Sequence, residues 1–474
     1  MPDVPINQKP YTNVDDVGNP FAIQSFIDMD KDDFMNNRFR PGLGGDTNDY
    51  FADLSTSEGI DGVFELMNYD FAAVFSNGSL YKVDEDGTAT EITGVTLNKD
   101  APVSFADFGT AGYFCNNSRI LKWTYTSSTC AFISDTDAPT DATHVAFFDS
   151  YLLALRADSQ IVEFSDVDAP DTWLGERFTA EQRPDNLVAM FARFGEVFLP
   201  GTETIENATD TGDATTPFQR IPGATTERGS ISPYSFTQID NSYFFLDFDR
   251  RVIRMAGRNP QVISNPFDNE FQELINIEDC IGFHFNPDGM TKYILHFPSD
   301  GKTYAYDYKL DYWAEYSYWN HTTGKRNSFL CKTGAFISKW NKYICGSKDE
   351  GKLYIASRDY TTDEGEDVIP ELVTGRIDWG KINRKQSRKI TFKVKRGNAA
   401  ITQTNAKIYM NKRINGKKQW LSNEKIIDLG ITGDTYSYKN FRNLGEYRDV
   451  QYRIRMQGAS SIISKMVETI VEIP

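Results

Sequence analysis

The sequence predicts an all-β protein, in which a β-propeller of six or seven blades is followed by a small β-sandwich-like C-terminal domain. Three observations predict this fold class. Aromatic residues make up 14% of the chain, and its Phe and Tyr, with many Thr, Val and Ile, favour half-buried pleated surfaces. No long segment has apolar residues at helical spacing. One apolar hairpin pattern recurs along the chain, from about residue 60 to about residue 360.

Each recurring unit is an apolar strand, a polar turn and a second strand, as in FAAVFSNGSLYKV and KYILHFPSDGKTYAYD. A lone hairpin is only marginally stable in water, so each unit must bury its apolar face against neighbours. Intervals of 40 to 51 residues suit four-stranded propeller blades whose two middle strands are the hairpin, although a set of ordinary β-sandwiches is also open. The second strands begin near Leu80, Ile120, Ile161, Thr204, Val252, Thr303 and Leu353.

Three parts are expected along the chain: an extended N-terminal segment at residues 1–40, the propeller at 41–365 and a basic all-β docking domain at 366–474. The acidic, Pro-ended stretch TTDEGEDVIP suits the second boundary. Beyond it, Ile390, Phe392 and Val394 alternate with mostly cationic residues. This alternation predicts a strand with one apolar face and one positive face.

Net charge divides the chain in the same way. Residues 371–474 contain 21 Lys and Arg and 9 Asp and Glu, a net charge of +12, so the total of −17 leaves −29 for residues 1–370. The positive faces could bind nucleic acid phosphates, dock on an acidic protein surface such as this propeller or that of a neighbouring copy, or remain solvated. Docking on protein is favoured, because no base-stacking aromatic residues are interleaved with the Lys and Arg in sequence.

Partner contacts are predicted in two places. Residues 206–229 are rich in Thr, Gly and Ala and lengthen one repeat, and long irregular loops of compact domains are often functional. The second place is the basic domain. The predicted partner-contact residues are Arg220, Arg228, Lys381, Arg384, Lys385, Arg388, Lys389, Lys393, Lys395, Arg396, Lys412, Arg413, Lys417 and Lys418.

Two acidic stretches could hold a chemical site. SDVDAPDTW, at residues 165–173, has Asp and Pro where these residues favour a turn, and it matches the aspartate box of sialidase-like propellers only in part. We interpret it as the structural turn that follows a second strand. DMDKDD, at residues 28–33, lacks the Gly and Glu of an EF-hand loop, which favours a solvated turn.

No catalytic, cofactor-binding or metal-binding residue is predicted. The chain has no phosphate loop, nucleophile elbow or dinucleotide fingerprint, and its four His show no metal-ligand spacing. Its five Cys form no CxxC pair and are expected to be small buried residues. No apolar run of about 18 residues is present to span a bilayer, and no secretory signal is visible.

Several motifs resemble the packaged-DNA stabilisation proteins of short-tailed, podovirus-type bacteriophages, which form the tail hub or nozzle below the portal. RFRPGLGG, at Arg38–Gly45, is similar to the family's N-terminal stretch. The most specific match is TIENATDTGDATTPFQRIPGATTERGS, at Thr204–Ser230. The segments YILHFPSDGKTYAYDYKLDYWAEYS, GKLYIASRDYTTDEG and NFRNLGEYRDVQYRIRM follow in the family's order. The resemblance departs at KINRKQSRKITFKVKR, where family members tend to be rich in glycine and to have fewer lysines.

The resemblance implies a virion structural protein of the phage tail, with no enzymatic activity and no cofactor. It would form a homo-oligomeric ring, a hexamer, below the portal and head-to-tail adaptor proteins, and it would contact a tail needle, tailspike or fibre. The ring would seal the portal channel to retain packaged double-stranded DNA and then serve as the conduit for DNA ejection. Assembly is expected in the host cytoplasm, without membrane insertion. The alternatives are a carbohydrate-active propeller that binds or hydrolyses glycans and a nucleic-acid-binding module.

Overall fold

The structure is a computed structural model that describes residues 3–4, 6, 23–46, 49–180, 183–213, 216–395, 406–429, 436–458 and 462–472. Strands dominate the described residues, and the helical segments among them are η1 (Asn265–Phe267), α1 (Asp268–Gln272) and η2 (Pro287–Gly289). None of the described helices has the length and apolar character needed to cross a membrane. The all-β prediction is therefore confirmed.

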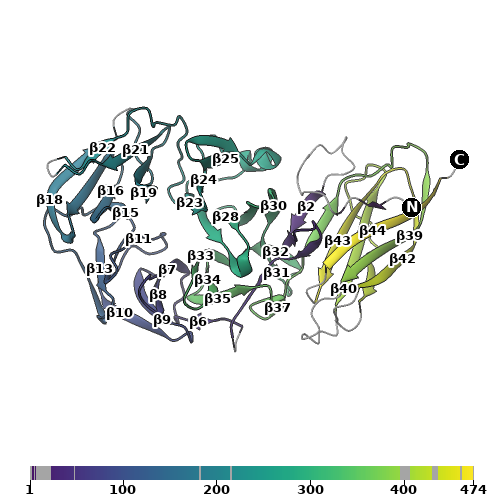
Figure 1. The fold of residues 1–474 in the computed structure, drawn as a ribbon. Coiled ribbons are helices and arrows are strands. Elements are labelled where there is room, and N and C mark those ends of the chain that lie inside the picture. Colours follow the sequence, from purple (N-terminus) through teal and green to yellow (C-terminus); the bar gives the residue numbers. More distant parts are fainter. Residues whose placement is uncertain are drawn as a thin grey trace.

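The first four blades of a β-propeller follow one another along the chain (Figure 1). In each, four antiparallel strands are arranged in sequence order, and the hairpin expected from the repeat supplies the two middle strands. These blades are β7 (Ile60–Glu65), β8 (Phe71–Ser76), β9 (Ser79–Asp84) and β10 (Ala89–Gly94); β11 (Ser104–Asp107), β12 (Ala111–Cys115), β13 (Leu121–Thr124) and β14 (Thr129–Phe132); β15 (Ala142–Phe148), β16 (Tyr151–Arg156), β17 (Ile161–Asp166) and β18 (Ala169–Thr179); and β19 (Phe191–Arg193), β20 (Glu196–Pro200), β21 (Ile205–Asp210) and β22 (Phe218–Arg220).

Three further blades bring the number to seven among the described residues, which decides between the six and seven expected. The seventh has three strands of its own, and its outermost strand β35 pairs with β5 (Gly42–Gly44) and β6 (Ala52–Asp53) from near the N-terminus. These blades are β23 (Thr237–Ile239), β24 (Ser242–Leu246), β25 (Val252–Ala256) and β26 (Asn259–Val262); β27 (Ile281–Phe285), β28 (Lys292–Phe297), β29 (Lys302–Asp307) and β30 (Tyr312–Glu315); and β33 (Cys331–Ile337), β34 (Lys342–Ser347) and β35 (Lys352–Ser357).

The turns of the hairpins explain why these segments fold locally. Between β8 and β9, Asn77 and Gly78 have φ of +53° and +76°, and such a pair of left-handed residues matches the twist of the flanking strands. Between β17 and β18, Asp168 has φ of +53° in the stretch that the sequence assigned to a turn. A structural turn in SDVDAPDTW is confirmed at Val167 and Asp168, whereas Asp171 lies in β18 and pairs with Lys122.

The core of the propeller is divided among the interfaces between blades. An apolar cluster joins each blade to the next, for example through Phe164 and Phe218, whose rings are 4.9 Å apart between blades 3 and 4. Another joins blade 7 to blade 1, where the indole of Trp340 donates a hydrogen bond of 2.9 Å to the carbonyl of Asp70. The ring of blades is therefore closed by apolar packing as well as by strand pairing.

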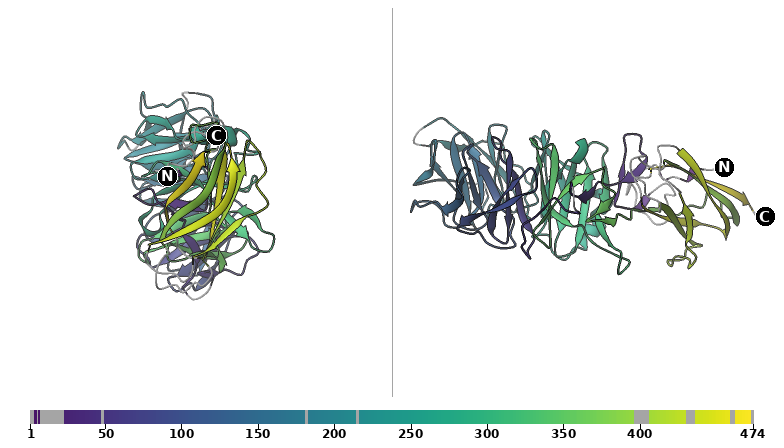
Figure 2. Two further views of the ribbon diagram at one scale, coloured as in Figure 1. Left: turned by 90° about the vertical axis from the view of Figure 1, so that its right-hand side faces the viewer. Right: turned by 90° about the horizontal axis from the view of Figure 1, so that it is seen from below.

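A C-terminal β-sandwich of two sheets adjoins blades 6 and 7 (Figures 1 and 2). Its buried faces meet through alternating residues such as Ile390 and Phe392 on one sheet and Ile454 and Met456 on the other. One sheet contains β44 (Ile462–Glu472), β39 (Lys385–Lys395) and β42 (Tyr436–Tyr447); the other contains β38 (Glu371–Thr374), β43 (Val450–Gln457), β40 (Lys407–Ile414) and β41 (Lys425–Asp428).

The N-terminal strands connect the two domains. β1 (Asp3–Val4) and β4 (Asn37–Phe39) pair with β44, and β4 also pairs with β3 (Met29–Lys31). β2 (Ile23–Ile27) lies between β30 of blade 6 and β38 of the sandwich, so one nine-stranded sheet runs through both. Two pairs of short strands complete the junction: the hairpin β31 (Ser317–Asn320) and β32 (Lys325–Ser328), and the pair β36 (Thr362–Asp363) and β37 (Glu366–Asp367).

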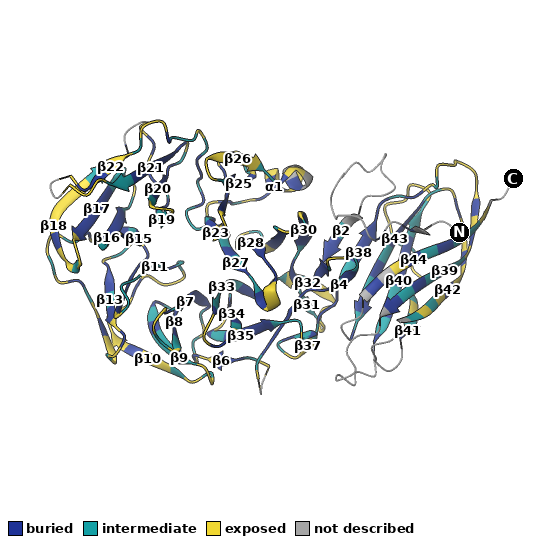
Figure 3. Cartoon of the chain, in the orientation of Figure 1, coloured by how far each residue is buried: buried dark blue, intermediate teal, exposed yellow. Residues whose placement is uncertain are grey.

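Propeller and sandwich also share one hydrophobic core. A single cluster of buried side chains extends from blades 5 to 7 through Phe26, Met29 and Phe39 of the N-terminal strands into the sandwich. Figure 3 shows the buried strands continuing across this junction. Burial of this size opposes hinge motion between the two domains, because separating them would expose the shared core.

Candidate functional site

The centre of the propeller contains a narrow cavity of about 230 Å³. The innermost strand of every blade contributes to its wall: β7, β11, β15, β19, β23, β27 and β33. A DNA duplex is wider than its major groove, which alone is about 12 Å wide and about 8.5 Å deep. A cavity of about 230 Å³ is therefore too small to hold a duplex. DNA therefore cannot pass through a single propeller.

The cavity holds one ion pair and two unpaired polar atoms. Asp61 accepts a hydrogen bond of 2.8 Å from Lys332, and burial raises the pKa of Asp61 while the lysine opposes the rise. The other Asp61 oxygen and the Thr237 hydroxyl have no hydrogen-bond partner among the described residues. Burial lowers the pKa of His144, whose ring stacks on that of Tyr234, to about 4.

This arrangement lacks the two facing carboxyl groups of a glycosidase. Such enzymes hold them roughly 5 to 10 Å apart across the scissile bond. Asp61 is the single carboxylate in the cavity wall among the described residues. No cluster of three or more possible metal ligands occurs in the described part of the chain either.

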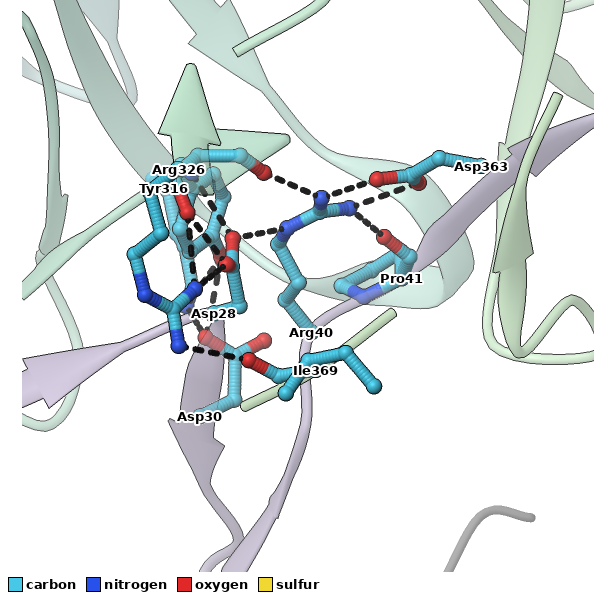
Figure 4. Close-up of polar contacts among 10 residues, drawn as sticks. Asp28, Asp30, Arg40, Pro41, Tyr316, Arg326, Asp363 and Ile369 are labelled. Atoms are coloured by element: carbon cyan, nitrogen blue, oxygen red, sulfur yellow. Dashed lines mark hydrogen bonds and ion pairs between the residues drawn. The ribbon is translucent and has the colours of Figure 1, made fainter. Parts of the chain in front are cut away.

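A buried charge network lies at the junction of propeller and sandwich, with Arg40 at its centre (Figure 4). The Arg40 side chain is fully buried, and each of its five N–H groups has an acceptor. The acceptors are Asp28, both oxygens of Asp363, and the carbonyls of Pro41 and Ser317. The aromatic ring of Phe329 lies 4.8 Å from the guanidinium carbon.

Asp28 connects Arg40 to the hairpin β31–β32. Its carboxylate accepts hydrogen bonds from the Ser317 backbone N–H at 2.7 Å and from Arg326 at 2.7 Å. Arg326 in turn donates to the carbonyl of Ile369, at 2.7 Å, just before β38 begins. One carboxylate thus ties the N-terminal strands, the propeller and the start of the sandwich together.

A second carboxylate of the same stretch is buried beside blade 6. Asp30 forms an ion pair with Lys292 and accepts a hydrogen bond of 2.9 Å from the Tyr316 hydroxyl. Its other oxygen has no partner among the described residues. Next to it, Lys31 is buried and donates to the carbonyl of Ile6 at 3.0 Å and to Asn37. Burial lowers the pKa of Lys31 to about 7.

The expected solvated turn at residues 28–33 is therefore wrong for its first half. Asp28 and Asp30 are buried and paired, whereas Asp32 and Asp33 occupy the turn after β3. Sequence alone did not suggest this, because the partners of the two acids lie up to 298 positions away along the chain. The nearest signal was the motif RFRPGLGG, since it contains Arg40.

Arg220 and Arg228, the predicted contact residues of the propeller, lie in and after blade 4. Arg220 pairs with Glu206 at 3.4 Å, and Arg228 pairs with Asp247 at 3.2 Å. Part of the loop predicted at residues 206–229 forms β21 and β22. Both arginines thus have carboxylate partners inside the propeller.

The predicted cations of the basic domain fall into buried and surface groups. Lys385 and Lys412 are buried and donate to backbone carbonyls, Lys385 to those of Asn383 and Arg448 and Lys412 to that of Leu444, so neither side chain can reach a partner without rearrangement. Arg396 and the side chain of Lys395 lie outside the described residues. The remaining predicted cations are wholly or partly exposed: Lys381, Arg384, Arg388, Lys389, Lys393, Arg413, Lys417 and Lys418.

Aromatic side chains do accompany cations on the outer face of the sheet β38–β43–β40–β41, contrary to the sequence interpretation. The Trp420 ring lies between Arg413 and Arg453, at 5.1 and 4.8 Å from their guanidinium carbons. Trp319, from the hairpin β31–β32, lies 5.7 Å from Arg455. Sequence distance hid Trp319, which is far from the basic domain along the chain, whereas Trp420 lies within the domain next to Lys417 and Lys418 and was overlooked. Each ring already stacks on arginine, so these faces are engaged within the molecule.

Comparison with known proteins gives one family. The model of the family described as "Bacteriophage P22 Gp10, beta-propeller" matches residues 55–361. Among curated proteins, no sequence matches the chain.

Comparison with solved structures finds likenesses of low similarity. The extracellular domain of BT4673 from B. thetaiotaomicron has 8% identity and a TM-score of 0.44 over 74% of this chain, which spans 43% of that chain. Virginiamycin B lyase from Staphylococcus aureus has 10% identity and a TM-score of 0.44 over 64% of this chain and 96% of its own. YCF48 bound to D1 peptide has 12% identity and a TM-score of 0.40 over 68% and 99%.

Proposed function

Because this chain belongs to the family described as "Bacteriophage P22 Gp10, beta-propeller", whose members are structural proteins that stabilise packaged phage DNA, we propose that it is a component of the phage tail hub or nozzle. In this role six copies form a ring below the portal and head-to-tail adaptor proteins. The ring seals the channel after packaging, carries a tail needle or neighbouring tailspikes, and opens for DNA ejection. It performs no catalysis and needs no cofactor.

The observation that carries this proposal is the family match over residues 55–361, which covers the strands of all seven blades except β5 and β6. The cavity of about 230 Å³ adds a constraint on the route of the DNA. Since a duplex cannot pass through one propeller, the conduit has to be the space enclosed by several copies. Acidic propellers around such a space would repel phosphates and keep DNA from adhering to the wall.

The shared core and buried charge network suit a part of this kind. DNA packed in a capsid presses on whatever closes the exit, so a closing ring must transmit force from its contact domain to its body without bending. Here propeller and sandwich are joined by a continuous sheet and by Arg40, Asp28 and Asp363. This rigidity supports the assignment to a load-bearing seal.

The test is a phage that lacks the gene for this chain. We expect its heads to fill with DNA and then lose it, and complementation with the wild-type chain should restore both DNA retention and a six-membered collar at the tail tip in electron micrographs. Mutant particles that keep their DNA would reject the sealing role. A collar that persists without the chain would reject its place in the tail.

A further inference from the structure

The outer face of the sheet β44–β39–β42 carries cations directly opposite one another. In the strand register, Lys389 of β39 faces Arg442 of β42, and Lys393 of β39 faces Lys465 of β44. Like charges opposite each other across strands are destabilising, so folding of the sandwich alone does not favour the Lys389–Arg442 pair, neither member of which forms an ion pair among the described residues. An anionic partner would favour it.

We call the five cations Arg388, Lys389, Lys393, Arg442 and Lys465 the basic face. Arg388, Arg442 and Lys465 are exposed, and Lys389 and Lys393 are partly exposed. Within the described part of the chain, no ion pair joins Arg388, Lys389 or Arg442 to a carboxylate. The exposed ring of Tyr438, with 67% of its surface accessible, lies on the same side of the sheet as Arg442. The strands β39 and β42 lie at the end of the molecule away from the propeller (Figures 1 and 2).

Carboxylates gather at the other end of the molecule, in blades 3 and 4. Asp149 lies in the turn before Tyr151, Asp166 ends β17 and Glu176 lies in the neighbouring strand β18. Asp210 ends β21 opposite Phe218, whose ring lies 5.2 Å from that of Tyr151. Burial and then the charges of these four carboxylates raise the pKa of Tyr151. We call these four residues the acidic pole. None of them forms an ion pair with a cation of the described residues. Exposed Val167 and Leu174, 49% and 60% accessible, lie in the same turn and strand and could form the apolar centre of an interface.

We propose that the basic face of one copy docks on the acidic pole of the next copy, which makes this the head-to-tail contact of the proposed ring. The inference rests on the proposed function for the ring and adds the two surfaces that would close it. Two different surfaces at opposite ends of one molecule give a heterologous contact, and such contacts generate rings when the rotation closes. The net charges of +12 and −29 on the two parts of the chain supply the complementarity.

The shape of the basic face favours a protein partner over DNA. A major groove about 12 Å wide admits a helix or a two-stranded ribbon, whereas three strands at about 4.8 Å spacing with side chains are too broad. The projected area of three strands of about 11 residues is roughly 500 Å², less than the roughly 800 Å² that each partner buries in a standard interface. The contact should therefore depend strongly on charge and weaken as salt screens it.

The test compares oligomeric states by sedimentation velocity at low salt. In Arg442→Glu/Lys465→Glu, each new glutamate faces a lysine across the strand, so the sandwich should fold at least as stably as before. We expect this variant to associate at least tenfold more weakly than the wild type. The control Lys99→Glu/Lys325→Glu makes the same charge change at exposed positions outside both proposed surfaces, before β11 and in the hairpin β31–β32, and should assemble normally.

A second variant attacks the other surface. Asp149→Asn/Glu176→Lys should also be monomeric, and Asn tolerates the left-handed backbone at position 149, where φ is +49°. Each defective chain keeps one intact surface. An equimolar mixture of the two variants should therefore form 1:1 dimers through one native contact and grow no further.

The outcomes separate the two proposals. If the basic-face variant assembles like the wild type, the docking surface is overturned while the ring remains. If the wild type itself stays monomeric at all concentrations, both the ring and this contact fail. If the variant assembles normally but loses binding of a short DNA duplex that the wild type retains at low salt, the basic face is a DNA contact and the proposal is overturned.

Discussion

Replacing Arg40 by methionine tests whether the buried network joins propeller and sandwich. The substitution keeps most of the side-chain volume but removes five hydrogen-bond donors and leaves the carboxylates of Asp28 and Asp363 buried without their shared cation. Asp28 retains Arg326, whereas Asp363 loses the one cation with which it forms an ion pair among the described residues. We expect the free energy of unfolding to fall by about 3–5 kcal/mol, the cost of breaking a buried ion pair.

The shift in melting temperature follows from the length of the chain. At about 2.1 cal/mol/K per residue, the unfolding entropy of 474 residues is about 1 kcal/mol/K, so a loss of about 4 kcal/mol lowers Tm by about 4 °C. Differential scanning calorimetry at pH 7 measures this shift. The matched control is Arg156→Met, because Arg156 also binds two carboxylates but is one-third exposed, and its loss should cost no more than about 1 kcal/mol.

Two further measurements make the reasoning refutable. Adding Asp363→Asn to Arg40→Met should recover part of the loss, because the stranded charge is removed. The difference between wild type and Arg40→Met should also narrow from pH 7 to pH 5, since burial raises the pKa of Asp363 and the stranded carboxyl group takes up a proton. The network does not stabilise the junction if Arg40→Met has the same melting temperature as Arg156→Met. The same conclusion follows if adding Asp363→Asn lowers the melting temperature of Arg40→Met further.

Three other perturbations give expected outcomes. Because the pKa of Lys31 falls from 10.5 to about 7 on folding, wild-type stability should decrease by up to about 5 kcal/mol between pH 10.5 and pH 7, and Lys31→Met should remove this slope in denaturant titrations. Folding lowers the pKa of His144 from 6.5 to about 4, so the free energy of unfolding should fall by about 3 kcal/mol as the pH decreases from 6.5 to 4. His144→Phe should reduce this loss of stability at acid pH. An unchanged loss in the variant would show that His144 does not cause it. Trp173→Ala should lower the free energy of unfolding by about 3–5 kcal/mol through lost burial, as a structural role requires; a loss below about 1 kcal/mol in denaturant titrations would contradict that interpretation.

The hairpins could be predicted from sequence because their determinants are local. The turn residues Asn77 and Gly78 and the apolar strands beside them lie within one short segment. Each hairpin must bury its apolar face against neighbouring hairpins, and their regular spacing along the chain predicted a propeller. The strand that completes blade 7 was beyond this reasoning, since β5 and β35 are about 300 residues apart and short strands such as GLG carry no pattern of their own.

The charge network was misread for the same physical reason. An acidic cluster in sequence resembles a solvated turn unless its cations are known, and Lys292 and Arg326 are separated from Asp30 and Asp28 by most of the propeller. The alternating pattern of Ile390, Phe392 and Val394 was enough to predict a strand. Which of the surrounding lysines would be buried was not predictable, since Lys385 is buried by carbonyl groups that only the folded turn brings together.

The placement of the N-terminal strands has a consequence for synthesis on the ribosome. β1 to β5 leave the exit tunnel first, yet their partners β35, β38 and β44 are among the last strands to be made. Until then Phe26, Met29 and Phe39 have no core to enter, and the nascent chain must carry an unsatisfied apolar end past seven forming blades. Without β44, the strands β1 and β4 would lose their pairing with the sandwich, so the N-terminal strands can reach their final positions only after β44 has been made.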